Sequence, residues 1–324
     1  MCLFEHNAFI VYTIYTNYTD IYSIIHKGNN VQKNPENHEK INNHIIQKQQ
    51  INPQVKLLKI YSPTIAQKAQ AGQFVILKTN PNSERIPLTL ATWDKYDGTI
   101  TLIFQEVGYS TIELGKLNEG EKIENLAGPL GTPSKIQKYG RIAMVCGGVG
   151  TAAAYPIAKA LKEAKNQIVS IIGARNKDLL ILQAEMISVS DEFYFTTDDG
   201  SSGRKGFVTD MLKTLISKNY NFDVVYAVGP PVMMNAVSEV TRQFGIKTIV
   251  SLNPIMVDGM GMCGACRVSI SDQTRFACVD GPEFDAHQVN FKELILRLKT
   301  YSAEEKVTTA HSECLGGTCT CHNH

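Results

Sequence analysis

Residues 141–164 read RIAMVCGGVGTAAAYPIAKALKEA, so that an apolar strand, a glycine-rich turn and a helix of small residues follow one another directly. This succession is the opening unit of a parallel, doubly wound sheet. Glycines let the backbone approach a pyrophosphate, and the helix N-terminus offers free N–H groups and a positive dipole end. The stretch therefore predicts a dinucleotide site at Gly147, Gly148, Gly150 and Thr151. A tight turn that only permits close helix–sheet packing is the alternative.

The pattern of alternating strands and helices extends over residues 137–250. Strict alternation of this kind predicts a doubly wound α/β domain. The strands are expected at residues 141–148, 166–175, 192–199, 224–230 and 247–252, and the helices at residues 151–164, 179–189, 206–216 and 231–245.

Further nucleotide contacts are expected where these strands end, because ligands of open α/β sheets bind beyond the carboxyl ends of the strands. Gly229 and Pro230 follow the fourth strand, and Asp198 and Asp199 follow the third. The two aspartates fit contacts to ribose or nicotinamide, and they fit turn residues equally well. Arg175, after the second strand, would meet the 2′-phosphate of NADP or lie free on the surface. The choice between NAD(H) and NADP(H) therefore stays open.

Residues 44–136 consist of short runs rich in Val, Ile, Leu and Thr, separated by turn signals. Such spacing is typical of a small β-barrel or sandwich. The runs, and hence the expected strands, cover residues 55–63, 73–79, 85–94, 99–107 and 121–130.

Two short motifs in this β-domain are candidates for flavin binding. A cationic side chain followed by a strand that carries a hydroxyl could hold a dinucleotide phosphate and an isoalloxazine edge. An edge strand with a surface arginine explains the same residues. The candidates are Arg85, Pro87, Leu88 and Thr89 in the first motif, and Gly108, Ser110 and Thr111 in the second.

A cysteine-rich module occupies residues 251–300, and a helix is expected at its end. Cys263 and Cys266 form a C-x2-C pair, and Cys278 follows after eleven residues. Plant-type [2Fe–2S] sites have the spacing C-x4-C-x2-C, and Asp258 stands in the first ligand place of that spacing. The sequence therefore predicts a [2Fe–2S] cluster with Asp258 and the three cysteines as ligands. A Zn site with the same four ligands, or a three-cysteine site in which Asp258 is a solvated loop residue, remains an alternative.

The two ends of the chain differ from the rest. Residues 1–43 form an extension, and the nearly all-polar stretch 28–50 is expected to be disordered. Residues 301–324 form a Cys/His-rich tail, which either binds Zn or copper or is a flexible, oxidisable segment. The candidate ligands of the tail are Cys314, Cys319, Cys321, His322 and His324.

Charge and composition exclude several classes of partner. The chain has 32 Lys and Arg residues against 31 Asp and Glu residues, a formal net charge of +1. A broad surface for nucleic acid or for an anionic membrane is therefore not expected. No stretch is long and apolar enough for a membrane span, and no secretion signal is evident. Clustered cysteines in a chain of this kind indicate metal or redox chemistry in the cytoplasm.

Taken in order, these motifs resemble the ferredoxin–NADP reductase superfamily over residues 44–300. The chain is similar to the electron-transfer subunit of dihydroorotate dehydrogenase B and to the small subunits of NADH-dependent ferredoxin–NADP oxidoreductase and sulfide dehydrogenase. The resemblance implies FAD on the barrel at Arg85–Thr89, pyridine nucleotide at Gly147–Gly150 and a [2Fe–2S] cluster in the C-terminal module. Asp258 in place of cysteine resembles the ferredoxin–NADP oxidoreductase branch.

The function that this resemblance implies is an electron relay between NAD(P)H, FAD, the [2Fe–2S] cluster and a larger partner subunit. In this branch the partner resembles the glutamate synthase small chain, and ferredoxin is a candidate acceptor. No paired carboxylates or nucleophile–base set is evident, which agrees with chemistry carried by cofactors. Two alternatives stay open: the electron-transfer subunit of dihydroorotate dehydrogenase B in pyrimidine biosynthesis, and a zinc-stabilised binding module without flavin.

Overall fold

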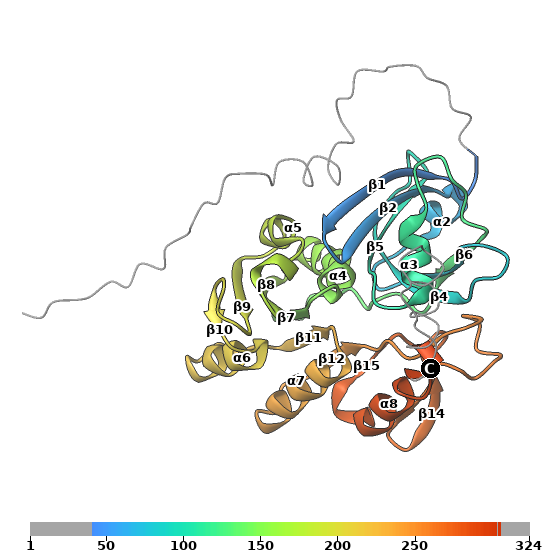
Figure 1. The fold of residues 1–324 in the computed structure, drawn as a ribbon. Coiled ribbons are helices and arrows are strands. Elements are labelled where there is room, and N and C mark those ends of the chain that lie inside the picture. The colour runs from blue at the N-terminus through green and yellow to red at the C-terminus, as the bar shows by residue number, and fades with distance from the viewer. Residues whose placement is uncertain (1–40, 303, 306–324) are drawn as a thin grey trace, which may run out of the picture. The chain divides into compact units, whose positions relative to one another are not determined.

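The computed structural model describes residues 41–302, 304 and 305. It contains a barrel-like β-sheet, a larger α/β sheet and a small hairpin (Figure 1). The predictions for residues 1–40 and for the Cys/His tail lie outside the described residues.

The first sheet has six strands in the order β1-β2-β5-β4-β3-β6, and all its pairs are antiparallel. At one end the sheet closes on itself, because His44 forms a bridge with Lys122 and the Ile45 N–H donates to the Glu121 carbonyl at 2.9 Å. Two short helices accompany the strands. The elements are β1 (Ile45–Asn52), β2 (Val55–Tyr61), α2 (Pro63–Lys68), β3 (Phe74–Lys78), β4 (Arg85–Asp94), β5 (Thr99–Gln105), α3 (Tyr109–Lys116) and β6 (Asn125–Leu130).

Strand β1 corrects the expectation of disorder for residues 45–50, the last part of the polar stretch 28–50. Its sequence IIQKQQIN buries only Ile45 completely, so it carries almost no hydrophobic signal. The strand is held by its antiparallel ladder with β2, in which Lys48 faces Leu58. Backbone pairing along a barrel edge therefore stabilises a strand that side-chain polarity conceals.

The second sheet has seven strands in the order β10-β9-β8-β7-β11-β12-β15, parallel except for β15. Helices α4 and α5 contact each other, as do α6 and α7, and Figure 1 shows one pair on each side of the sheet. Chain order reverses between β7 and β11, which is the ligand-binding switch point of this fold. The elements are β7 (Arg141–Gly147), α4 (Gly150–Glu163), β8 (Gln167–Ala174), α5 (Gln183–Ser188), β9 (Glu192–Thr197), β10 (Arg204–Lys205), α6 (Val208–Ser217), β11 (Val224–Val228), α7 (Pro231–Gln243), β12 (Thr248–Ser251) and β15 (Glu283–Asp285).

The helix expected over residues 179–189 is shorter than predicted. A 3-10 turn covers Lys177–Leu179, and α5 begins only at Gln183. Leu182 between them has a left-handed φ of 53°, which interrupts the helix.

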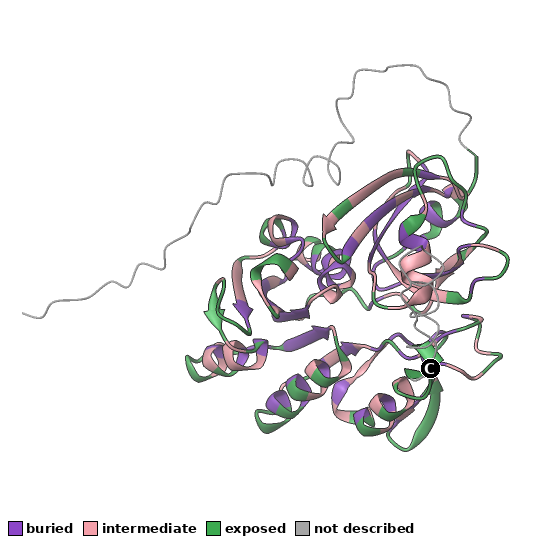
Figure 2. Ribbon diagram, in the orientation of Figure 1, coloured by how far each residue is buried: buried purple, intermediate pink, exposed green. Residues whose placement is uncertain are grey.

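The cysteine-rich module shares its core with both sheets. A hairpin of β13 (Arg267–Ile270) and β14 (Gln273–Phe276) precedes β15, and the helix α8 (Phe291–Leu298) packs against α7 and β13. Cys266 and Cys278 belong to the same buried cluster as β11 and as Phe74 of β3. Figure 2 shows β11 fully buried at the centre of this arrangement. The module is therefore held rigidly beside both sheets.

No helix within residues 41–302 is both long enough and apolar enough to cross a membrane.

Candidate functional site

The glycine-rich turn after β7 touches the turn after β11 at the switch point. A Cβ on Gly147 would lie 2.5 Å from Met233 Sδ and 3.0 Å from Pro230 Cδ. A Cβ on Gly150 would lie 2.5 Å from the Val228 carbonyl oxygen. Only glycine allows the two turns to approach so closely, which confirms the packing role that the sequence left as one of two explanations.

Gly148 differs from its neighbours, because a Cβ there would meet nothing within 4 Å. Its φ of 52° is left-handed, and its N–H donates to the Gly173 carbonyl at 2.9 Å. The open space lies directly before the first turn of α4, where the positive end of the helix dipole favours a pyrophosphate. The Thr151 and Ala152 N–H groups of this turn donate to the Gly148 and Val149 carbonyls at 3.1 and 3.0 Å. Thr151 is fully buried behind this turn, and its hydroxyl has no hydrogen-bond partner in the described part of the chain.

The residues predicted at the ends of β8 and β9 lie close together and are exposed. The Asp198 N–H donates to the Ala174 carbonyl at 3.1 Å, and the Asp199 N–H donates to the Arg175 carbonyl at 3.2 Å. Hydrogen bonds from Ser201, foremost that of its side chain, lower the pKa of Asp199. Asp199 therefore has the turn role that the sequence allowed, beside Arg175 at the same edge of the sheet.

The four residues of the first flavin motif follow one another on β4. Arg85 is exposed, and Pro87, Leu88 and Thr89 are half-buried. β4 pairs with β3, so that Thr89 faces Phe74, and it also packs against α4. The strand predicted to hold the flavin therefore lies against the helix that follows the nucleotide turn.

The second flavin motif forms the start of α3. Thr111 Oγ1 accepts from the Val107 and Gly108 N–H groups, both at 3.1 Å, and donates to the Gly108 carbonyl at 2.9 Å. Its hydroxyl therefore caps the helix. A Cβ on Gly108 would meet nothing within 4 Å, so this side of the turn is open, and Ser110 beside it is half-buried.

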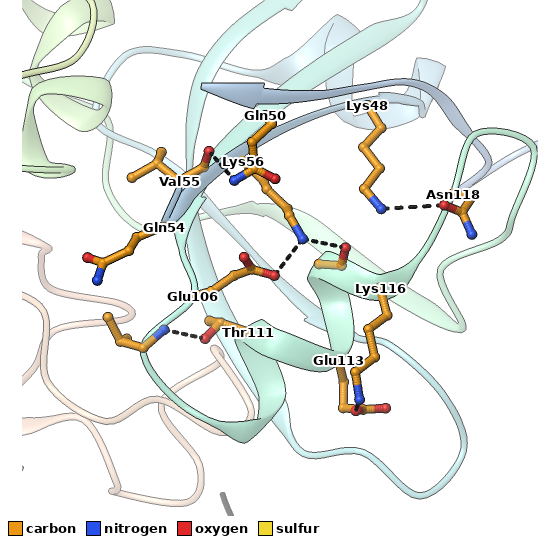
Figure 3. A network of polar contacts seen from close by, with 12 residues as sticks. Lys48, Gln50, Gln54, Val55, Lys56, Glu106, Thr111, Glu113, Lys116 and Asn118 are labelled. Atoms are coloured by element: carbon orange, nitrogen blue, oxygen red, sulfur yellow. Dashed lines mark hydrogen bonds and ion pairs between the residues drawn. The ribbon is translucent and has the colours of Figure 1, made fainter. Parts of the chain in front are cut away.

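A half-buried ion pair fixes the other end of α3 (Figure 3). Lys56 Nζ lies 2.7 Å from Glu106 Oε1 and 2.8 Å from the Gly115 carbonyl oxygen. A side chain at Gly115 would overlap the Glu106 carboxylate. The pair therefore joins the last turn of α3 to β2 and to the residue after β5, which holds the helix and its open N-terminus in place.

Two of the predicted cluster ligands lie side by side. Cys266 and Cys278 are buried free thiols with their Sγ atoms 3.1 Å apart, and the Cys278 N–H donates to Cys266 Sγ at 3.5 Å. Burial, followed by the neighbouring Cys266 thiol, raises the pKa of Cys278 to about 12.

The other two predicted ligands form a second pair at the surface. Asp258 Oδ2 accepts from the Cys263 N–H at 2.8 Å, and the two carboxylate oxygens also accept from the N–H groups of Met260 and Met262. The Met260 N–H, with smaller contributions from Cys263 and Met262, lowers the pKa of Asp258. The left-handed Gly259 and Gly261 give the loop the turns that these bonds need.

No group of three or more His, Cys, Asp and Glu side chains converges on one point within the described residues. The predicted ligands lie as two pairs, Cys266 with Cys278 and Asp258 with Cys263. A [2Fe–2S] cluster needs two protein ligands on each of two irons. Two thiols in contact, with a carboxylate and a third thiol on the adjoining loop, fit that demand.

Glu283 is a feature that the sequence did not reveal. Its Oε1 lies 2.5 Å from Ser134 Oγ, and a Cβ on Gly72 would also contact this carboxylate. Desolvation raises the pKa of Glu283 to about 7. The contact joins three parts of the chain: β15 through Glu283, the segment between the two sheets through Ser134, and the barrel through Gly72. No local sequence motif indicates this contact.

Comparisons with known proteins agree with this arrangement. Residues 253–290 match the family described as the iron–sulfur cluster binding domain of dihydroorotate dehydrogenase B. Residues 144–239 match the oxidoreductase NAD-binding domain.

Several relatives align with most of this chain, and the alignments cover most of each relative as well. A homolog of the dihydroorotate dehydrogenase B electron-transfer subunit from Thermotoga maritima is 47% identical over 266 residues, 82% of this chain and 94% of the relative. The dihydroorotate dehydrogenase B electron-transfer subunit from Clostridium perfringens is 32% identical, and the alignment covers 72% of this chain and 92% of that subunit. A chain in a solved structure of NADH-dependent reduced ferredoxin–NADP oxidoreductase is 46% identical and superposes with a TM-score of 0.80. The superposition covers 85% of this chain and 98% of that chain. The chain therefore belongs to the family of dihydroorotate dehydrogenase B electron-transfer subunits and their homologues, as an NAD(P)H-dependent flavin and iron–sulfur oxidoreductase.

Proposed function

We propose that the chain is the small subunit of an enzyme of the ferredoxin–NADP oxidoreductase type, and that it moves electrons between NAD(P)H and a larger subunit. Identity to the solved ferredoxin–NADP oxidoreductase chain is 46%, against 32% for the Clostridium perfringens subunit of dihydroorotate dehydrogenase B. The Thermotoga maritima relative, at 47%, is named only a homolog of that subunit. Asp258 in the first ligand place also supports this branch.

The observation that carries the proposal is the pairing of the donor residues. Cys266 and Cys278 would bind one iron, and Asp258 and Cys263 would bind the other. When bound, the cluster would accept and release single electrons, which a hydride donor cannot do. The chain's own part is to bury the first pair, to leave Asp258 half-buried and Cys263 exposed, and to supply backbone N–H groups around both pairs.

The loop between the two pairs lies against the barrel. A Cβ on Gly259 would be 2.6 Å from Leu130 Cδ1 and 2.8 Å from Ile76 Cγ1, at β6 and β3. Ile76 in turn pairs with Pro87 on β4. Only one strand therefore separates the cluster loop from the strand assigned to the flavin, a short path for electrons.

The partner surface is assigned to the exposed side of the same loop. Met260 is 62% exposed and Met262 84%, and Val257 and Val279 are also exposed. Apolar side chains gathered in this way are typical of protein interfaces. The family's electron-transfer subunits work with a larger subunit, and we assign to this surface one that resembles the glutamate synthase small chain, with ferredoxin as the distal acceptor.

The test is co-purification and turnover with candidate partners. The chain alone should reduce dyes with NAD(P)H but show little ferredoxin–NADP turnover, which should appear when the larger subunit is added. Full turnover by the chain alone would contradict the need for a partner.

The second candidate is the dihydroorotate dehydrogenase B subunit, which the description of the matched iron–sulfur family favours. It predicts capture of a dihydroorotate dehydrogenase subunit and NADH formation driven by dihydroorotate.

A further inference from the structure

We propose that Arg267 and Arg297 together hold the Cys263–Cys266 loop and raise the reduction potential of the cluster there. This inference rests on the proposed function, because it takes the cluster to lie at this loop.

The two guanidinium groups reach the loop from different elements. Arg267 begins β13, and its Nη1 donates to the Gly264 carbonyl at 3.2 Å. Arg297 lies in the last turn of α8, and its Nη2 donates to the Ala265 carbonyl at 3.2 Å. Consecutive peptide groups between two ligand cysteines are therefore both bound by arginine.

These bonds orient the other side of each peptide. A trans peptide is planar, and its N–H points away from its C=O. The Gly264 carbonyl shares its peptide with the Ala265 N–H, and the Ala265 carbonyl shares its peptide with the Cys266 N–H. Neither N–H has an acceptor among residues 41–302. The Gly264 carbonyl also accepts the Arg267 backbone N–H at 3.3 Å, whereas the Ala265 carbonyl is bound by the Arg297 side chain alone. Since these bonds fix the carbonyls, the two N–H groups remain available as donors to cluster sulfur.

The positive charges are not neutralised locally. No carboxylate in the described part of the chain forms an ion pair with either guanidinium. Arg297 is half-buried, whereas Arg267 is exposed and more strongly screened by salt. Reduction adds a negative charge to the cluster, so nearby cations and N–H donors both favour the reduced form. Arg297 should therefore have the larger effect.

Arg275 provides a matched control. It lies on β14 of the same hairpin and is exposed, but its guanidinium donates to Gln273 Oε1 at 2.9 Å instead of to the loop. Replacing Arg275 removes an equal charge from the same module and leaves the loop carbonyls bound.

The experiment is a redox titration of the full chain with its cluster, followed by EPR, for wild type and for R267Q, R297Q, R267Q/R297Q, R297K and R275Q. We expect the reduction equilibrium constant of the double variant to fall about tenfold, or about 59 mV for one electron. The reduction potential of the cluster should fall further in R297Q than in R267Q. The potential of R297K should lie between those of R297Q and wild type, and the potential of R275Q should equal that of wild type.

A double variant that keeps two irons and titrates like wild type would overturn the inference, as would an equal shift in R275Q. If R297Q cannot retain iron, the potential of R267Q decides whether the inference holds. Arg267 is exposed at the surface, so its replacement should leave the fold and the cluster intact. Flavin reduction by NADH should be unchanged in every variant. Absence of a cluster signal in wild type would instead refute the proposed function itself.

Discussion

Ser134 Oγ and Glu283 Oε1 lie 2.5 Å apart although 149 positions separate them in the chain. The Thr132 N–H next to Ser134 donates to the Gly281 carbonyl at 2.7 Å, and Thr132 Oγ1 donates to the Val279 carbonyl at 2.8 Å. The segment between the two sheets is therefore fastened to the segment that follows Cys278. These contacts fix the position of the cysteine module beside the barrel.

The Glu283 contact predicts a pH-dependent stability. The pKa of Glu283 is about 7 in the folded chain and 4.5 as its ordinary value, so the folded state holds the proton more tightly. Stability from this group is therefore present at low pH and is lost as pH rises from about 4.5 to about 7. Glu283→Gln should remove this loss, so the variant should gain about 1–3 kcal/mol relative to wild type between pH 5 and pH 8, after allowance for solvent screening.

Denaturant unfolding at both pH values measures this difference. Glu163→Gln, at an exposed position of α4, serves as the control and should show no such gain. A stability difference between Glu283→Gln and wild type that does not change with pH would contradict the expected titration.

The two glycines of the nucleotide turn should respond differently to alanine. The Cβ of Gly148→Ala would lie in open space, and the left-handed backbone would cost about 1 kcal/mol, so the fold should persist. Because the added methyl group occupies the space assigned to the nucleotide, NADH should bind at least tenfold more weakly. Gly150→Ala overlaps the Val228 carbonyl, so unfolding should become easier by about 1–3 kcal/mol. Thermal unfolding and stopped-flow flavin reduction separate the two effects. Unchanged NADH affinity in Gly148→Ala would remove the site from this turn.

Asp258→Asn tests the carboxylate as an iron ligand. Asparagine still accepts N–H bonds from the loop but lacks the charge of a ligand, so the cluster should be lost or change its EPR spectrum. Asp280→Asn is the matched control, because Asp280 also accepts a backbone N–H, from Phe276 at 2.7 Å. An unaltered spectrum and iron content in Asp258→Asn would limit Asp258 to a role in loop structure.

The exposed methionines should affect partner binding without affecting the cluster. Met260→Ser with Met262→Ser removes the most exposed apolar side chains of the loop and should weaken binding of the larger subunit about tenfold or more. Tyr96→Ser, at a 98% exposed position of the barrel, should leave binding unchanged. Equal affinity of all three proteins in a pull-down titration would place the partner elsewhere.

Much of the fold was predictable because hydrophobic patterning is local. The α/β alternation and the turn at Gly147–Gly150 indicated their structures, and the comparisons confirm the family and its FAD, iron–sulfur and NAD(P)H cofactors. Strand β1 escaped prediction because its only fully buried side chain is Ile45. The helix expected over residues 179–189 begins only at Gln183, so the predicted start was wrong. No sequence pattern indicates the left-handed conformation of Leu182 that interrupts the helix.

The site was less predictable, because its contacts join distant parts of the chain. No spacing rule connects Ser134 to Glu283 or Arg297 to Ala265. Thr111, which the sequence proposes as a flavin contact, uses its hydroxyl to cap α3, and this bond could not be foreseen from the motif. The individual site residues therefore stay predictions, for which the structure supplies positions.

The central claim is best tested by anaerobic purification of the chain, with measurement of flavin, iron and zinc and an EPR spectrum after NADH addition. The account predicts one FAD and two irons per chain, with a reduced [2Fe–2S] signal of about one spin. A colourless protein that contains zinc and no flavin would contradict it.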